Sequence, residues 1–92
     1  VWQLGMELSK TIYTATREFP GDEKFGLISQ MRRAAVSIPS NIAEGHARGT
    51  SGEFQRFLCI ALGSLAELET QIILSQQLNF LKEHDTQDVL SM

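Results

Sequence analysis

Six polar side chains recur at helical spacing through the middle of the chain. They lie three or four residues apart, so on a helix they would form one polar stripe beside an apolar seam. The stripe consists of Gln30, Arg33, Ser37, Asn41, Glu44 and Arg48. A guanidinium and a carboxylate on one stripe can bind a small ligand or substrate, with Arg33 and Glu44 as the candidate pair. They can also form ion pairs with a neighbouring helix and so fix its register.

The partners of this polar stripe are expected on the helix that follows. If the two helices pack antiparallel, reflection about the loop brings Ser64 opposite Arg33, with Glu67 one turn away. The same reflection brings Arg56 close to Glu44. We therefore interpret the stripe as mainly structural, with Arg33 pairing with Glu67 and Glu44 pairing with Arg56. The alternative, in which the stripe faces a groove and binds a ligand or a partner, stays open.

The patterns of known catalytic and metal sites are missing from the sequence. The two histidines, His46 and His84, fall in predicted loops and lack the Glu-x-x-His spacing of a di-iron bundle. There is no zinc-type cluster, phosphate-binding loop or dinucleotide fingerprint. Cys59 has no neighbouring base and lies in an apolar run, so we expect a small buried hydrophobe. We expect no metal, no cofactor and no enzymatic activity.

The charge of the chain argues against a broad nucleic-acid-binding face. The 92 residues carry a formal net charge of -3, whereas nucleic-acid-binding domains are normally basic. Only the segment from Pro20 to Thr50 is positive. Its Lys24, Arg32 and Arg48 are the candidate contacts to RNA or another partner.

The composition predicts a single soluble domain, 1–92, in a reducing compartment. One cysteine cannot form an intrachain disulfide. The longest uninterrupted apolar run has six residues, and a membrane-spanning helix needs about 20. The first residues do not resemble a signal peptide. We therefore expect a cytoplasmic protein that does not enter a membrane.

Three helices are expected to position these side chains. Apolar residues from Leu4 to Phe19 recur at steps of three or four and predict a first helix that Pro20 and Gly21 end. A second helix is predicted from about Glu23 to His46, with Asp22 as its N-cap. Thr50 and Glu53 form a capping box for a third helix, which ends near Asn79 in a left-handed conformation. Asp85 or Thr86 is expected to cap a fourth.

Pro39 lies in the middle of the second predicted helix. The apolar steps of three and four continue through it without a shift in phase, which favours one kinked helix. Ser40 and Asn41 are expected to satisfy the backbone groups that the proline frees. The alternative is a stop near Ser37 and a new start with Pro39 in the first turn.

These helices predict an all-α, antiparallel up-and-down four-helix bundle whose fourth helix is truncated in this chain. Residues 57–62, Phe-Leu-Cys-Ile-Ala-Leu, are apolar around the whole helix. A small bundle cannot bury a peripheral helix on all sides, so we expect another subunit to cover the outer face. The alternative is that the fourth helix covers it.

Three segments resemble one known family. Residues 30–45 read QMRRAAVSIPSNIAEG, residues 53–70 read EFQRFLCIALGSLAELET, and residues 78–81 read LNFL. They are similar to the 23S rRNA intervening-sequence proteins, as is FPGDEKFGL upstream. The resemblance implies a soluble bacterial four-helix bundle that assembles as a pentameric ring, in a family for which no enzymatic activity is established. In a related branch, accessory proteins of diversity-generating retroelements bind a reverse transcriptase and nucleic acid through a basic surface.

We therefore expect a non-catalytic homo-oligomer of the interaction or scaffold type, with ribosomal RNA or a protein as a candidate partner. One alternative is a direct nucleic-acid binder that uses the basic second helix. Another is an enzyme or small-ligand binder at the Arg33/Glu44 stripe.

Overall fold

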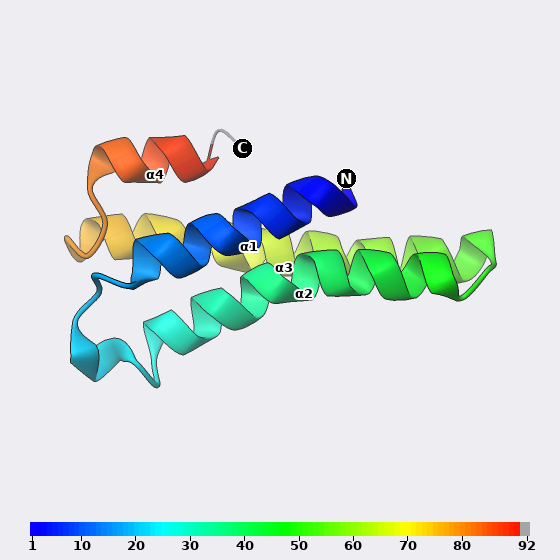
Figure 1. Cartoon of the computed structure of the whole chain (residues 1–92), viewed down its shortest axis with the longest axis horizontal. Coiled ribbons are helices and arrows are strands. Elements are labelled where there is room, and N and C mark those ends of the chain that lie inside the picture. Colours follow the sequence, from blue (N-terminus) through cyan, green and yellow to red (C-terminus); the bar gives the residue numbers. More distant parts are fainter. Residues whose placement is uncertain (91–92) are drawn as a thin grey trace.

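The computed structural model describes residues 1–90 and contains four α-helices joined by short turns (Figure 1). The helices are α1 (Trp2–Thr16), α2 (Leu27–Ala47), α3 (Ser51–Gln77) and α4 (Glu83–Leu90), with a short 3₁₀ helix, η1 (Gly21–Glu23), between α1 and α2. The described residues contain no strand. The predicted all-α class is therefore confirmed.

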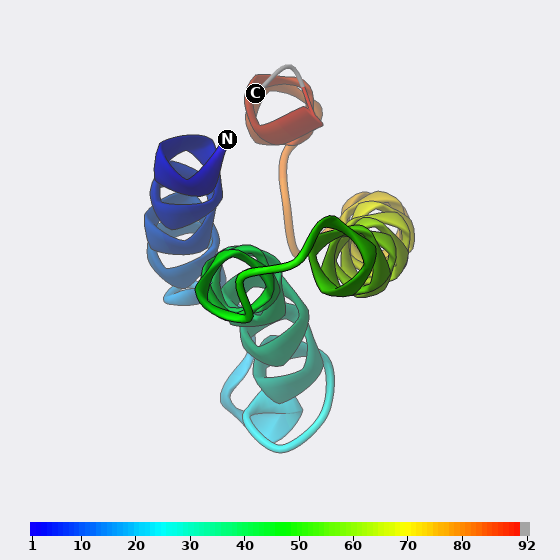
Figure 2. The same cartoon turned by 90° about the vertical axis from the view of Figure 1, so that its right-hand side faces the viewer.

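The helices form an antiparallel bundle. Viewed along the long axis, α1, α2, α3 and α4 stand at the four corners of the cross-section (Figure 2). Helix α2 packs against both α1 and α3, and the short α4 returns beside them. The core lies between these helices, with Ile12, Met31, Ala35 and Leu68 almost fully buried. The predicted up-and-down bundle is thus present, and its fourth helix is short.

Both ends of α3 have the caps that the sequence predicts. The Thr50 hydroxyl accepts a hydrogen bond from the Glu53 N–H at 3.2 Å. At the other end, Asn79 has a φ of 62°, in the left-handed region. The N–H of Phe80 then reaches back to the Ser75 carbonyl at 2.9 Å, which satisfies one of the last carbonyls of the helix.

Three predicted helix boundaries are wrong. Helix α1 ends at Thr16, three residues before Phe19. Asp22 does not cap α2, because residues 21–23 form η1 and α2 begins only at Leu27. The Glu23 carboxylate takes over this role and accepts a hydrogen bond from the Leu27 N–H at 3.2 Å. Helix α4 starts at Glu83, before both predicted caps.

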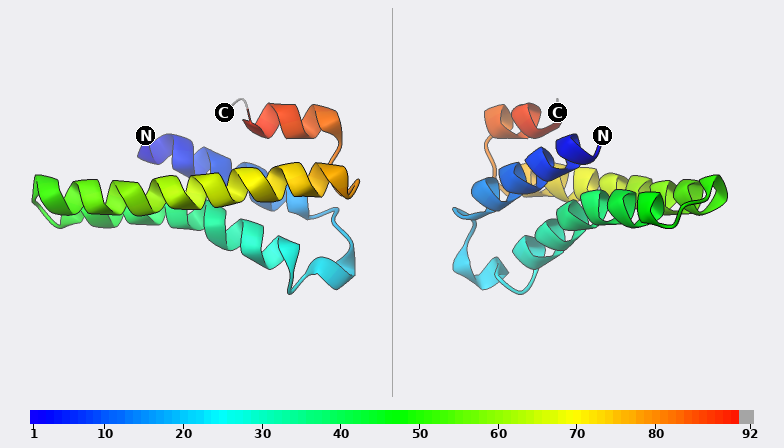
Figure 3. Two further views of the ribbon diagram at one scale, coloured as in Figure 1. Left: turned by 180° about the vertical axis from the view of Figure 1, so that it is seen from behind. Right: turned by 45° about the vertical axis from the view of Figure 1, so that its right-hand side comes forward.

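Helix α2 is continuous through Pro39, as predicted. Figure 3 shows its first half turning away from α3 while the second half runs alongside that helix. Proline removes the hydrogen bond to the carbonyl four residues earlier, here that of Ala35. The Ser9 hydroxyl of α1 approaches this carbonyl at 3.1 Å and its own Gly5 carbonyl at 2.9 Å. The freed acceptor is thus satisfied from another helix.

The expected helpers Ser40 and Asn41 do not fill this role. Ser40 is exposed, and the Asn41 amide donates to the Ser37 carbonyl at 2.7 Å instead. The contact from α1 depends on Gly5, which is buried against the proline. A Cβ at Gly5 would lie 3.2 Å from the Cβ of Pro39. The missing side chain therefore lets α1 cross α2 closely at the kink.

We expect Ser9→Ala to destabilise the protein by about 1 kcal/mol, because the Ala35 carbonyl loses its donor. In the background of Pro39→Ala, the new backbone N–H serves that carbonyl, and Ser9→Ala should then cost less than about 0.5 kcal/mol. Urea melts of the four proteins in this double-mutant cycle measure the difference. Equal costs in both backgrounds would contradict the role given to Ser9.

Candidate interaction surfaces

The middle of the polar stripe is engaged between α2 and α3. The hydroxyls of Ser37 and Ser64 lie 2.9 Å apart across the two helices. The Asn41 amide donates to the Ser37 hydroxyl at 2.8 Å, so that three polar side chains form one chain of hydrogen bonds. This part of the stripe has the structural role that the sequence predicts, since it fixes the register of the α2–α3 pair.

The predicted ion pairs are absent. Among the side chains that the structure describes, the ion pairs are Lys10–Glu7 at 3.2 Å and Arg56–Glu53 at 3.8 Å, each within one helix. Glu44 therefore does not reach Arg56, and Arg33 does not reach Glu67. Along with Gln30, these side chains are exposed.

The register of the two helices also differs from the predicted one. Ser64 lies opposite Ser37, one helical turn further along α2 than the predicted Arg33. Gly45 contributes to this offset because it admits Phe57 against its backbone; a Cβ at Gly45 would lie only 2.7 Å from the Cβ of Phe57. The shift places Glu44 level with Phe57 and Arg33 level with Leu68, so the predicted partners are near in level. They do not pair, because all four charged side chains are exposed, outside the contact between the helices.

We expect Glu44→Ala and Arg56→Ala each to change the free energy of unfolding by less than about 0.5 kcal/mol, because both side chains are exposed and unpaired with each other. Their effects should add in the double mutant. Urea denaturation of the two single mutants and the double mutant checks this. A coupling energy above about 1 kcal/mol would show that the two side chains interact after all.

The three candidate nucleic-acid contacts lie at two separate places on the structure. Lys24 and Arg32 line one depression between α1 and α2. Arg48 lies at the other end of α2, about 24 Å along the helix from Arg32. There its guanidinium lies 5.2 Å from the ring centroid of Phe57, which Arg56 also approaches, at 5.0 Å. The predicted set is therefore not one surface.

Two aromatic residues also line the depression, and neither was among the contacts predicted from the sequence. The Arg32 guanidinium lies 4.5 Å from the ring centroid of Tyr13, and the Lys24 ammonium lies 5.7 Å from that of Phe25. The adjacency of Lys24 and Phe25 was visible in the sequence. The contact between Tyr13 and Arg32 was not, because it joins two helices.

The prediction for Cys59 is wrong, because the residue is exposed in the structure. It belongs to a row of apolar or small residues along the outer side of α3, which we call the outer stripe. The outer stripe consists of Cys59, Leu62, Ala66 and Ile73. Leu62 is 63% exposed and Ile73 is 40% exposed. Helix α4 does not cover this side, since it packs above the groove between α1 and α3.

A comparison with family models matches residues 1–92 to the 23S rRNA-intervening sequence protein. The chain belongs to the 23S rRNA-intervening sequence protein family. Residues 30–45 and 53–70, which carry the resemblance in the sequence, form most of the α2–α3 hairpin of this family member. Among curated proteins, none matches the chain.

The histidines of this family member are both in helices, contrary to the prediction of loops. His46 lies in the last turn of α2, with its ring 6.3 Å from that of Phe54, and His84 lies in α4. Among the described residues, no group of three or more His, Cys, Asp or Glu side chains is arranged to hold a metal ion.

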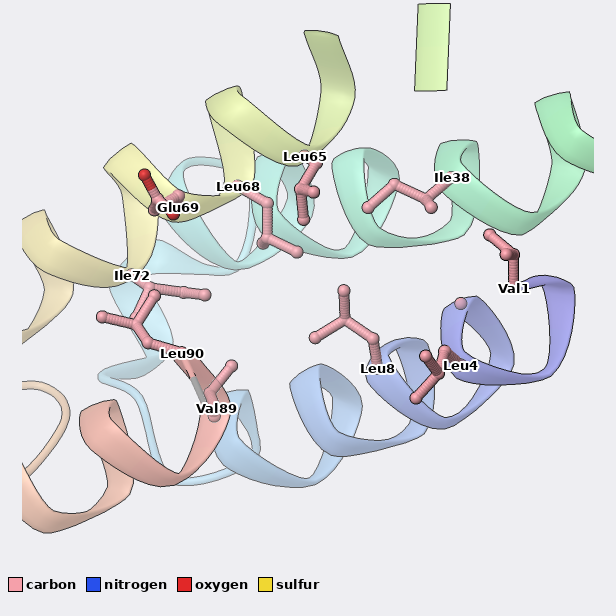
Figure 4. Close-up of a pocket in the computed structure, with 11 residues that line it drawn as sticks. Val1, Leu4, Leu8, Ile38, Leu65, Leu68, Glu69, Ile72, Val89 and Leu90 are labelled. Carbon is pink, nitrogen blue, oxygen red and sulfur yellow. The ribbon is translucent and has the colours of Figure 1, made fainter. Parts of the chain in front are cut away.

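An apolar groove of about 290 Å³ lies between α1, α3 and the end of α4 (Figure 4). Leu4 and Leu8 of α1 face Leu65 and Ile72 of α3 across it, and Val89 of α4 lies at one end. Helix α3 therefore has apolar side chains on two sides, one that lines this groove and one that forms the outer stripe.

By length and composition, α3 is the one helix within residues 1–90 that could cross a membrane.

Proposed function

We propose that this protein is a non-catalytic interaction protein that works as a homo-oligomer, assembled through the outer stripe of α3. The observation that carries the proposal is the exposure of Leu62 and Ile73 on a helix whose other side packs against α2. Apolar rows of this kind on a soluble protein mark surfaces that another macromolecule covers.

A second copy of the chain is the occupant that the geometry of α3 supports best. Beside the outer stripe, α3 exposes a second apolar row that contains Ile60, Leu74 and Leu78. Leu74 follows Leu62 by twelve residues, which places the two rows roughly 120° apart around the helix. Two different apolar faces on one subunit suit a head-to-tail contact, and head-to-tail contacts close into rings.

Family membership supports the finer points of the proposal. The resemblance implies a ring of five subunits in the bacterial cytoplasm, and ribosomal RNA is the candidate partner that the family description suggests. The protein would then act as a scaffold whose surface is repeated around the ring. The exposed, separated positions of Arg33 and Glu44 give no support to the alternative of a ligand site between them.

Light scattering at micromolar concentration tests the proposal. The wild-type protein is expected at a multiple of 10.3 kDa. Leu62→Lys combined with Ile73→Lys should give the mass of one chain, because two charges would be buried in the interface. Ser40→Lys is the matched control on the exposed side of α2 and should keep the wild-type mass. A wild-type mass of one chain would overturn the proposal.

Sedimentation with phospholipid vesicles tests the alternative that the outer stripe of α3 binds a membrane and not a second subunit. An oligomer hides the outer stripe, so we expect the wild-type protein to stay in the supernatant with vesicles of phosphatidylcholine and phosphatidylglycerol. Co-sedimentation of the wild-type protein would show that lipid covers the stripe and would contradict the proposal.

A further inference from the structure

We propose that the depression between α1 and α2 binds single-stranded nucleic acid by stacking bases on aromatic rings and pairing phosphates with cations. We call this site the stacking surface. Its aromatic and polar lining residues are Tyr13, Lys24, Phe25, Ser29, Arg32 and Arg33, and the apolar Ile28 and Val36 complete the lining. The site lies on the α1–α2 side of the bundle, so it is separate from the outer stripe of α3.

The charge of the stacking surface is opposite to that of the whole chain. Three cations line it, and no carboxylate is among its lining residues, although the chain has a net charge of -3. Neutralising phosphates is the main source of affinity for nucleic acids. A patch of three cations matches a few phosphates of a single strand and is too small for the broad contact with a duplex.

The aromatic rings of the stacking surface are positioned to stack with bases, which is the second contribution to binding. Phe25 is 89% exposed, and the packed core does not include it. Its ring has a cation beside it, with the Lys24 ammonium 5.7 Å from the centroid. Tyr13 is 42% exposed, and the Arg32 guanidinium lies 4.5 Å from its ring centroid. Exposed rings flanked by cations are the arrangement by which proteins bind single strands without reading their sequence.

Arg32 is already held in place before any ligand binds. Its Nε donates to the Thr16 hydroxyl at 2.9 Å, and one terminal nitrogen approaches the Tyr13 carbonyl at 3.4 Å. Thr16 is itself buried, so this anchor is rigid. A side chain that is ordered in advance loses less entropy on binding. The remaining guanidinium N–H groups of Arg32 stay available for a phosphate.

Fluorescence anisotropy of labelled dT12 and rU12 with the full chain tests the site. Both oligonucleotides should bind with similar affinity, because stacking and phosphate pairing do not use the 2′-hydroxyl. With two or three phosphates neutralised, the logarithm of affinity should fall with the logarithm of salt at a slope of about -1.4 to -2.1. A blunt duplex should bind at least tenfold more weakly.

Two matched pairs of variants locate the binding. Phe25→Ala should weaken binding by about tenfold, within the range for one stacked base, and Trp2→Ala, an exposed aromatic at the far end of α1, should not. Arg33→Gln should reduce the salt slope by about 0.7, and Arg48→Gln should leave it unchanged. A circular-dichroism melt checks that the variants fold.

Three results would overturn the proposal: no binding of either oligonucleotide by the wild-type protein, an unchanged affinity for Phe25→Ala, or equal affinity for the duplex. The outcome is separable from that of the proposed oligomer. Phe25→Ala should keep the wild-type mass in light scattering. The Leu62→Lys, Ile73→Lys double variant should still bind dT12 through its intact stacking surface.

Discussion

Replacing Leu68 by alanine is expected to destabilise the protein by about 2 to 5 kcal/mol. Leu68 is 1% exposed and lies on the face of α3 that meets the core. It is central to the bundle, because it shares a groove wall with Leu8 of α1, Ile38 of α2 and Val89 of α4. Truncation would remove apolar contacts and leave a cavity that four helices cannot all move to fill.

Urea denaturation at one fixed protein concentration measures this cost, because the stability of the proposed oligomer would depend on concentration. Leu4→Ala is the matched control. Leu4 lies along the same groove but is 58% exposed, so its truncation should cost less than about 1 kcal/mol. Similar midpoints for the two variants would show that the groove wall around Leu68 is not the core.

The second large effect is expected at Gly45, where alanine should destabilise the protein by about 1 to 3 kcal/mol. The added Cβ would lie 2.7 Å from the Cβ of Phe57 and 3.4 Å from the Cα of Phe54. Neither atom can move away without the α3 backbone, so the ends of α2 and α3 would have to separate. In an isolated helix the same change would be favourable.

Gly52→Ala provides the control for Gly45→Ala. Gly52 lies in the first turn of α3, and a Cβ there would meet nothing within 4 Å. This variant should leave stability unchanged or raise it by up to about 1 kcal/mol. Thermal melts of both variants make the comparison. If Gly45→Ala melted as high as Gly52→Ala, the close contact between α2 and α3 at this level would be refuted.

Local signals in the sequence were sufficient to predict much of the fold. The N-cap at Thr50, the left-handed Asn79 and the uninterrupted apolar phase through Pro39 each depend on residues close in the chain. All three are confirmed. The start of α2 was misplaced because η1 inserts a separate turn and Glu23 caps from four residues away.

The candidate site was harder to predict because it depends on how helices meet. A reflection about the loop gave the α2–α3 register with an error of one turn, since it does not take into account the close packing of Gly45 and Phe57. The predicted ion pairs are absent for a different reason, because Arg33, Glu44, Arg56 and Glu67 are exposed and lie outside the contact between the two helices. The exposure of Cys59 and the contact of Tyr13 with Arg32 likewise depend on which helix faces which.

The hydrogen bond from Ser9 to the Ala35 carbonyl has a consequence for the cooperativity of folding. Before α1 docks, water serves the acceptor that Pro39 frees, and docking replaces that water by the Ser9 hydroxyl. Docking in turn needs the kinked helix, because Gly5 packs on the proline ring. The kink of α2 and the docking of α1 therefore stabilise each other at this crossing.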